Sequence, residues 1–131
     1  AVQAVLQHGR RPYAIGFVGN VFSVRSVEDK PEAVELIKSS IRRNSISSIC
    51  ATLLALAART DTTDVLNEIK VPTLIIRGKE DKITPAELME ELHKKIKGST
   101  YIEFEHCGHL PNLEDTEKFN LHMNTFMQEK V

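Results

Sequence analysis

The stretch Val71-Pro72-Thr73-Leu74-Ile75-Ile76-Arg77-Gly78-Lys79-Glu80-Asp81-Lys82-Ile83-Thr84-Pro85 decides the fold of this chain. Its first part, Val71–Ile76, is apolar and β-branched without alternation, which is typical of a strand that is buried on both faces of a parallel sheet. Thr84-Pro85-Ala86-Glu87 then predicts a helix start, with threonine as the N-cap, proline at the first helical position and glutamate completing a capping box. We expect this helix to stop at Gly98, because glycine readily adopts the left-handed conformation that ends a helix.

A second strand and a last helix follow along the chain. Tyr101–Phe104 predicts the strand, and an apolar stripe at helical spacing predicts the helix: Phe119, Met123, Phe126 and Met127. The order strand, helix, strand, helix implies two adjacent parallel strands joined by a right-handed crossover. Since such a unit normally extends a larger sheet, we expect an α/β fold with parallel strands that is incomplete within these residues.

Residues 1–63 have a different pattern and predict a small helical unit. One helix is expected over residues 46–57, and another after Pro31, where apolar residues recur at helical spacing: Val34, Leu36, Ile37 and Ile41. The segment Gly16–Ser26 mixes glycine with apolar residues and fits neither pattern. We therefore divide the chain into a helical segment, residues 1–63, and a β-α-β-α unit, residues 64–131.

Two polar side chains follow the predicted strands at the same edge of the sheet. Asp81 lies in the loop after the first strand, and His109 lies after the second, just past Gly108. Sites in open parallel sheets form in the loops at the carboxyl ends of the strands. A carboxylate there can accept the Nδ1–H of an imidazole and fix its tautomer, which leaves Nε2 free to take a proton from a nucleophile. We predict that Asp81 and His109 are the acid and the base of a catalytic triad.

Simpler interpretations exist for these side chains and their neighbours. An aspartate after a strand is often a solvated turn residue, and a loop histidine often has no chemical role. His106-Cys107-Gly108-His109 offers three metal ligands, but no second cluster completes a four-coordinate zinc site, so we expect no metal. Cys107 as a nucleophile would need an activating base and a lowered pKa, and we expect a packed thiol instead. Glu80 is expected to be exposed and not to be the triad acid.

The motifs together resemble the last part of an α/β-hydrolase. Val71–Pro85 with its G-x-x-D and T-P elements, the capped helix, the second strand and the Gly108-His109-Leu110-x-x-x-Glu114 loop look like the final β-α-β-α unit of that family. Leu54–Leu66 is similar to the end of the cap domain in one group of this family, the 3-oxoadipate enol-lactonases and related small carboxylic-ester hydrolases. The resemblance implies that residues 1–63 are the cap, which in this family lies between the sixth and seventh strands. It is firm over Leu54–Met127 and weak before Pro31.

The resemblance also defines what these residues do not contain. In this family the nucleophilic serine stands in a G-x-S-x-G elbow that precedes the acid and the base. No two of the six glycines stand four residues apart, so the 131 residues hold no such elbow. We therefore expect the chain alone to be inactive. The family implies a small ester or lactone as the substrate of the intact enzyme, and no cofactor.

Composition narrows the possible partners and the compartment. A net charge of −1 without a basic cluster argues against nucleic acid or an anionic membrane surface as a partner. No apolar run approaches the length that a membrane-spanning helix needs. Cys50 and Cys107 lie far apart in the sequence and do not form a disulfide framework, which favours a reducing compartment. We therefore expect a cytoplasmic protein.

Two hypotheses about function follow from the sequence. In the first, the chain is the C-terminal part of a serine hydrolase for esters or lactones, and a missing N-terminal half supplies the nucleophile; the chain is then a fragment or a truncated reading frame of a longer protein. In the second, it is a non-catalytic homodimeric module for binding or assembly. Two copies would then join the bare edges of their strands into a four-stranded sheet.

Overall fold

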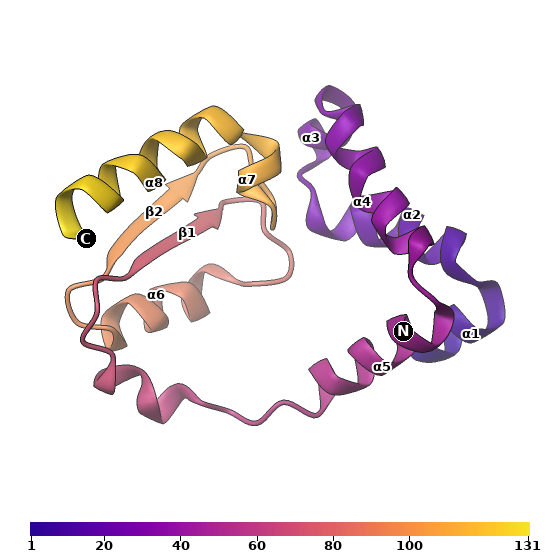
Figure 1. Ribbon diagram of the computed structural model, residues 1–131, viewed down its shortest axis with the longest axis horizontal. Coiled ribbons are helices and arrows are strands. Elements are labelled where there is room, and N and C mark those ends of the chain that lie inside the picture. The colour runs from indigo at the N-terminus through magenta and orange to yellow at the C-terminus, as the bar shows by residue number, and fades with distance from the viewer.

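The computed structural model describes residues 1–131 and contains a helical unit followed by a two-stranded sheet with flanking helices (Figure 1). The helical unit comprises α1 (Val2–His8), α2 (Arg10–Val21), α3 (Val24–Asp29), α4 (Pro31–Arg43) and α5 (Ile46–Ala57). An extended connection with the 3₁₀ turn η1 (Thr63–Glu68) leads to β1 (Leu74–Gly78), α6 (Ala86–Lys95), β2 (Thr100–Phe104), α7 (Pro111–Glu114) and α8 (Thr116–Lys130). None of these helices combines the length and the apolar character needed to cross a lipid bilayer.

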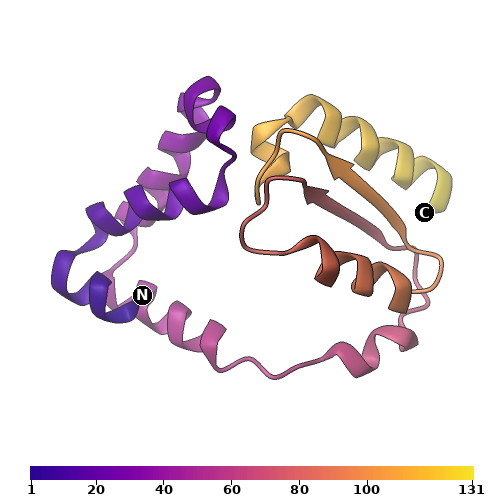
Figure 2. The ribbon, with the colours of Figure 1, turned by 180° about the vertical axis from the view of Figure 1, so that it is seen from behind.

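The sheet has the topology that the sequence predicts. β1 and β2 are parallel, with Leu74 opposite Thr100 and Gly78 opposite Phe104. Helices α6 and α8 lie on opposite sides of the strands in both views (Figures 1 and 2). α8 packs on β2 through the Phe104 ring, which has the Lys118 ammonium 4.5 Å from its centroid and the His122 ring 5.7 Å away. Since the sheet has only two strands, the other edge of β1 has no partner.

In the helical unit, the capping residues and the apolar residues favour the same helices. Pro31 occupies the first turn of α4, and the Ser45 side chain accepts the Ser48 N–H at the start of α5, so both predicted helices are confirmed. The segment Gly16–Ser26, which fits no pattern in the sequence, contains the end of α2 and the start of α3. Two small cores hold the unit together, one of Val18, Val21, Phe22 and Val34 and one of Val5, Ile49 and Cys50.

Several local predictions are wrong in detail. β1 starts at Leu74 rather than Val71, and α6 ends at Lys95, three residues before Gly98, whose φ of 79° is the expected left-handed conformation. Thr84 is not the N-cap of α6; Pro85 takes that position without a side-chain hydrogen bond. The Thr84 hydroxyl instead donates to the Asp81 carboxylate, because an ionised acceptor makes a stronger hydrogen bond than a backbone group does.

Candidate active site

Asp81 lies in a tight loop between β1 and α6. The loop is held against the segment after β2, since the Lys79 N–H donates to the Phe104 carbonyl at 2.9 Å and the Glu80 N–H to the Cys107 carbonyl at 2.9 Å. The Asp81 carboxylate accepts the N–H groups of Ile83 at 2.8 Å and Thr84 at 3.1 Å, in addition to the Thr84 hydroxyl. Its side chain is only 4% exposed. These hydrogen bonds therefore hold the Asp81 carboxylate in place independently of its contact with an imidazole.

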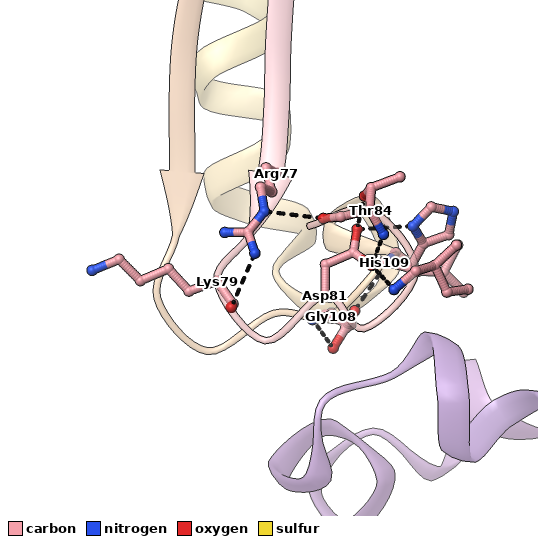
Figure 3. A network of polar contacts seen from close by, with 9 residues as sticks. Arg77, Lys79, Asp81, Thr84, Gly108 and His109 are labelled. Carbon is pink, nitrogen blue, oxygen red and sulfur yellow. Dashed lines mark hydrogen bonds and ion pairs between the residues drawn. The ribbon is translucent and has the colours of Figure 1, made fainter. Parts of the chain in front are cut away.

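His109 completes the pair that the sequence predicts to be close. Its Nδ1 lies 2.9 Å from Asp81 Oδ2, across 28 residues of sequence (Figure 3). The His109 side chain is 36% exposed, and no residue of the chain bonds its Nε2. The arrangement thus fixes one nitrogen on a buried carboxylate and leaves the other accessible, which is the geometry that a general base requires.

The hydrogen bonds of Asp81 set its charge state. Burial of the carboxyl acts to raise its pKa, but hydrogen bonds from Thr84, His109 and the backbone N–H groups of Thr84 and Ile83 outweigh it. The pKa of Asp81 therefore lies below the 3.8 of a free aspartate. The carboxylate is ionised at neutral pH, as it must be to accept Nδ1–H and to stabilise an imidazolium.

Arg77 supports the Asp81 loop from inside the sheet. Its side chain is 7% exposed, and it donates from Nε to the Thr84 carbonyl at 3.2 Å and from Nη2 to the Lys79 carbonyl at 3.4 Å (Figure 3). Its Nη1 lies 3.4 Å from Glu103 Oε1 on β2. The guanidinium thus joins both ends of the loop to the neighbouring strand. The only sign of this role in the sequence is a single arginine between the apolar run and Gly78, which by itself predicts no function.

The loop that carries His109 contacts the helical unit. The His109 N–H donates to the Val21 carbonyl at 2.7 Å, at the end of α2. Gly108 lies so close to this segment that a Cβ there would be 2.7 Å from the Val21 oxygen and 2.8 Å from the Ser23 nitrogen. Glycine is needed at this position for close approach of two backbones. The helical unit and the sheet therefore meet at the candidate base.

The other sequence candidates do not form a second site. No group of three or more histidine, cysteine and acidic side chains gathers in a geometry that would hold a metal ion. Glu80 is half-buried rather than exposed, because its loop lies against Cys107, and it does not bond His109. Cys107 is 3% exposed, and burial, together with the nearby carboxylates of Glu114 and Asp115, raises the pKa of its thiol to about 12.

Cys107 is expected to resist alkylation in the folded chain. Because the thiolate is the reactive form, a pKa near 12 and the burial of the sulfur should slow its reaction with iodoacetamide at neutral pH roughly a thousandfold relative to a free cysteine. The measurement is peptide mapping by mass spectrometry after timed alkylation, in a Cys50→Ala background that leaves one thiol. The same variant unfolded in urea is the control and should react at the rate of a free thiol. Rapid modification of folded Cys107 would contradict the packed-thiol interpretation.

Comparison with known proteins gives a family match over most of the chain. The model of the α/β hydrolase fold matches residues 29–116. Pimeloyl-[acyl-carrier protein] methyl ester esterase of Neisseria meningitidis serogroup B is 40% identical over 63 residues, which are 48% of this chain and 24% of the relative. 3-Oxoadipate enol-lactonase 2 of Acinetobacter baylyi is 30% identical over 118 residues, which cover 90% of this chain and 43% of the relative.

Solved structures show the same partial coverage. A thermophilic esterase from Thermogutta terrifontis superimposes with a TM-score of 0.87 at 26% sequence identity, over 98% of this chain and 47% of the esterase. The chain therefore spans about half of this matched structure and less than half of the curated relatives.

Proposed function

Because this chain belongs to the α/β-hydrolase family, we propose that it supplies the acid and the base of a serine hydrolase that acts on small carboxylic esters or lactones. The observation that carries the proposal is the Asp81–His109 pair, with Nδ1 held 2.9 Å from a buried carboxylate and Nε2 unbonded. The names of relatives at 40% and 30% identity, an esterase and an enol-lactonase, support the substrate class.

Each residue of the pair has a defined part in the proposed reaction. His109 Nε2 takes the proton of a serine hydroxyl as the oxygen attacks the substrate carbonyl, and returns it to the leaving alkoxide. The resulting acyl-enzyme is then attacked by water, whose proton passes to His109 and from there to the departing serine oxygen. Asp81 keeps the imidazole in the Nδ1–H tautomer and stabilises the imidazolium at each step. The serine and the oxyanion donors come from outside these 131 residues.

We assign the rest of the catalytic core to further polypeptide that pairs with β1. The free edge of β1 is available to a strand, and the chain spans about half of the solved esterase that it matches. Only 19 of the 131 residues are buried, and large apolar side chains on α5 and α6 are more than half exposed, such as Leu54 at 59% and Leu88 at 58%. Apolar faces of this kind are normally buried against other protein, which supports the proposal that further polypeptide packs on them. In the resulting assembly, residues 1–63 act as the cap over the substrate.

The free edge of β1 also supports a second candidate, a non-catalytic homodimeric module. Two copies that pair their β1 edges would form a four-stranded sheet without adding a serine elbow. We favour the hydrolase because a binding module has no need of an imidazole whose Nδ1 is fixed on a buried carboxylate. The two cysteines are both free and buried, which supports a reducing compartment such as the cytoplasm for either candidate.

The test of the proposed function is a chimaera in which this chain replaces the aligned part of the Acinetobacter baylyi enol-lactonase. We expect the chimaera to hydrolyse an activated ester and to be labelled by a fluorophosphonate. The chain alone should show no turnover above the buffer rate, because it offers no nucleophile for Nε2 to activate. Phosphonate-sensitive hydrolysis by the purified chain alone, or a folded chimaera without activity, would contradict the proposal. A dimer in light scattering, together with an inactive chimaera, would favour the homodimeric module.

A further inference from the structure

Glu114, the last residue of α7, is a buried carboxylate without a cation. It is 4% exposed, and none of the ion pairs of the chain includes it. Its partners are three backbone N–H groups: Gly108 at 2.9 Å from both oxygens, Leu110 at 3.1 Å from Oε1 and Ser23 at 2.9 Å from Oε2. Burial of a charge is costly unless hydrogen bonds replace its hydration, so these three donors account for its presence here.

Two of the three donors are the residues on either side of His109. Gly108 and Leu110 both bond the Glu114 carboxylate, while the N–H of His109 itself bonds the Val21 carbonyl at 2.7 Å. Three consecutive amides are thus engaged, so the backbone that carries the imidazole cannot rotate without breaking a buried hydrogen bond. The Asp81 side chain fixes the imidazole ring, and Glu114 fixes the backbone beneath it.

The third donor, Ser23, belongs to the helical unit. Ser23 follows the end of α2, and its N–H has Glu114 as its partner across 91 residues of sequence. Apolar contacts reinforce the link, because Leu110 and Leu113 pack against the buried cluster of Val18, Val21, Phe22 and Val34. One carboxylate therefore ties the loop of residues 107–114 to the junction between α2 and α3.

We propose that Glu114 is a positioning residue for His109, and that it makes the helical unit a support of the base as well as a cover for substrate. This inference rests on the proposed function, in which His109 is the base. Loss of the Glu114 carboxylate, or of the Ser23 N–H alone, therefore loosens the backbone at residues 108–110 and weakens the hydrogen bond from His109 Nδ1–H to Asp81.

The chain offers a matched pair of variants for the Ser23 link. Ser23 has φ −64° and follows Phe22 at φ −94° and ψ 152°, so the backbone angles at position 23 suit proline. The proline Cδ takes the place of the amide hydrogen and displaces the Glu114 oxygen, which lies 2.9 Å from the nitrogen, so this variant breaks the link at Ser23 completely. Ser23→Pro removes the N–H donor together with the hydroxyl that caps α3, whereas Ser23→Ala removes the hydroxyl alone. Glu114→Ala removes the acceptor of all three N–H donors. Glu114→Gln keeps one acceptor oxygen but turns an amide NH₂ toward the backbone donors.

Nuclear magnetic resonance on the 131-residue chain tests the proposal without any turnover. We expect Glu114→Ala to raise the hydrogen-exchange rates of the residue 108–110 amides about tenfold or more and to broaden or remove the His109 Nδ1–H resonance. The exchange rate at Ile75 in β1 is expected to stay unchanged. Glu114→Gln should lie between Glu114→Ala and the wild type. Ser23→Pro should raise exchange at Gly108 and Leu110 several-fold above Ser23→Ala.

Distinct outcomes overturn the inference. A folded Glu114→Ala that keeps the Nδ1–H resonance and protected amides would show that His109 needs no support from Glu114. If Glu114→Ala does not fold, equal exchange in Ser23→Pro and Ser23→Ala would reject the link to the helical unit. The two proposals can also fail separately. If Glu114→Ala loses the His109 Nδ1–H resonance but the chimaera shows no hydrolysis, the positioning role of Glu114 is retained and the proposed function is rejected.

Discussion

Asp81→Asn is expected to reduce the turnover of the serine-bearing chimaera by about 10⁴-fold. Asparagine fills the same space, but it presents a neutral amide to His109 Nδ1, so the imidazole loses both the acceptor that fixes its tautomer and the charge that stabilises the imidazolium. Because the side chain of Asp81 is only 4% exposed, water has little access to replace the lost acceptor. The measurement is kcat and kcat/KM on an activated ester, and the loss should fall on kcat.

The adjacent acid provides the matched control for Asp81→Asn. Glu80→Gln makes the same chemical change one residue away, and Glu80 does not bond His109, so its effect on kcat should be less than about tenfold. His109→Ala should cost as much as Asp81→Asn or more, and the double variant should be no worse than His109→Ala alone, because the pair acts as a unit. An equal loss in Glu80→Gln and Asp81→Asn would show that the acid is misassigned.

The sequence was sufficient for the parts of this fold that depend on neighbouring residues. The β-branched run before Gly78 predicts a buried parallel strand. The order strand, helix, strand predicts that the next strand pairs with it in parallel, and β1 and β2 are indeed adjacent and parallel. Pro31 predicts the start of α4 for the local reason that its missing N–H costs nothing in a first helical turn. The proximity of Asp81 and His109 follows from the same topology, because both loops leave the carboxyl ends of neighbouring strands.

Two features of the structure could not be predicted from the sequence, one because two acceptors compete for a hydroxyl and one because the partner is distant along the chain. The capping-box prediction at Thr84 is wrong because the hydroxyl has a charged acceptor, Asp81, that competes with the helix end. Glu114 was visible in the sequence only as a member of a motif, since its Ser23 donor lies 91 residues away. The catalytic roles of Asp81 and His109 stay predictions, because proximity establishes the hydrogen bond and only kinetics tests what it does.

The contact between the helical unit and His109 also bears on the hydrolase proposal. Under the proposed function, a cap that only covers substrate has no reason to bond the proposed base, yet the Val21 carbonyl accepts the His109 N–H and Ser23 donates to Glu114. If the helical unit is the cap of a longer hydrolase, as proposed, its movement would be transmitted to His109. The segment that fits no pattern in the sequence, Gly16–Ser26, thus contains the residues through which the two units meet.

Gly78→Ala is expected to destabilise the chain by about 3 kcal/mol, the upper end of the usual cost of overpacking, because the added atom meets backbone that cannot rotate away. A Cβ on Gly78 would lie 2.5 Å from the Cys107 carbonyl carbon and closer still to the carbonyl oxygens of Cys107 and Gly108. These atoms are backbone, and the Glu80 N–H bond to the Cys107 carbonyl holds them in place, so relief requires that the two loops separate. Because Asp81 and His109 belong to those loops, the Nδ1–Oδ2 hydrogen bond should be lost as well.

Gly16→Ala is the control for Gly78→Ala, with an effect of opposite sign. Gly16 lies inside α2, and a Cβ there meets no atom within 4 Å, so alanine should stabilise the helix by about 0.5–1 kcal/mol. Urea titrations of the wild type and both variants, followed by circular dichroism, give the free energies of unfolding. If Gly78→Ala unfolds at the same urea concentration as the wild type, the close approach of β1 to the loop that carries His109 is absent in solution. The support that this approach gives to the Asp81–His109 pair would then be absent as well.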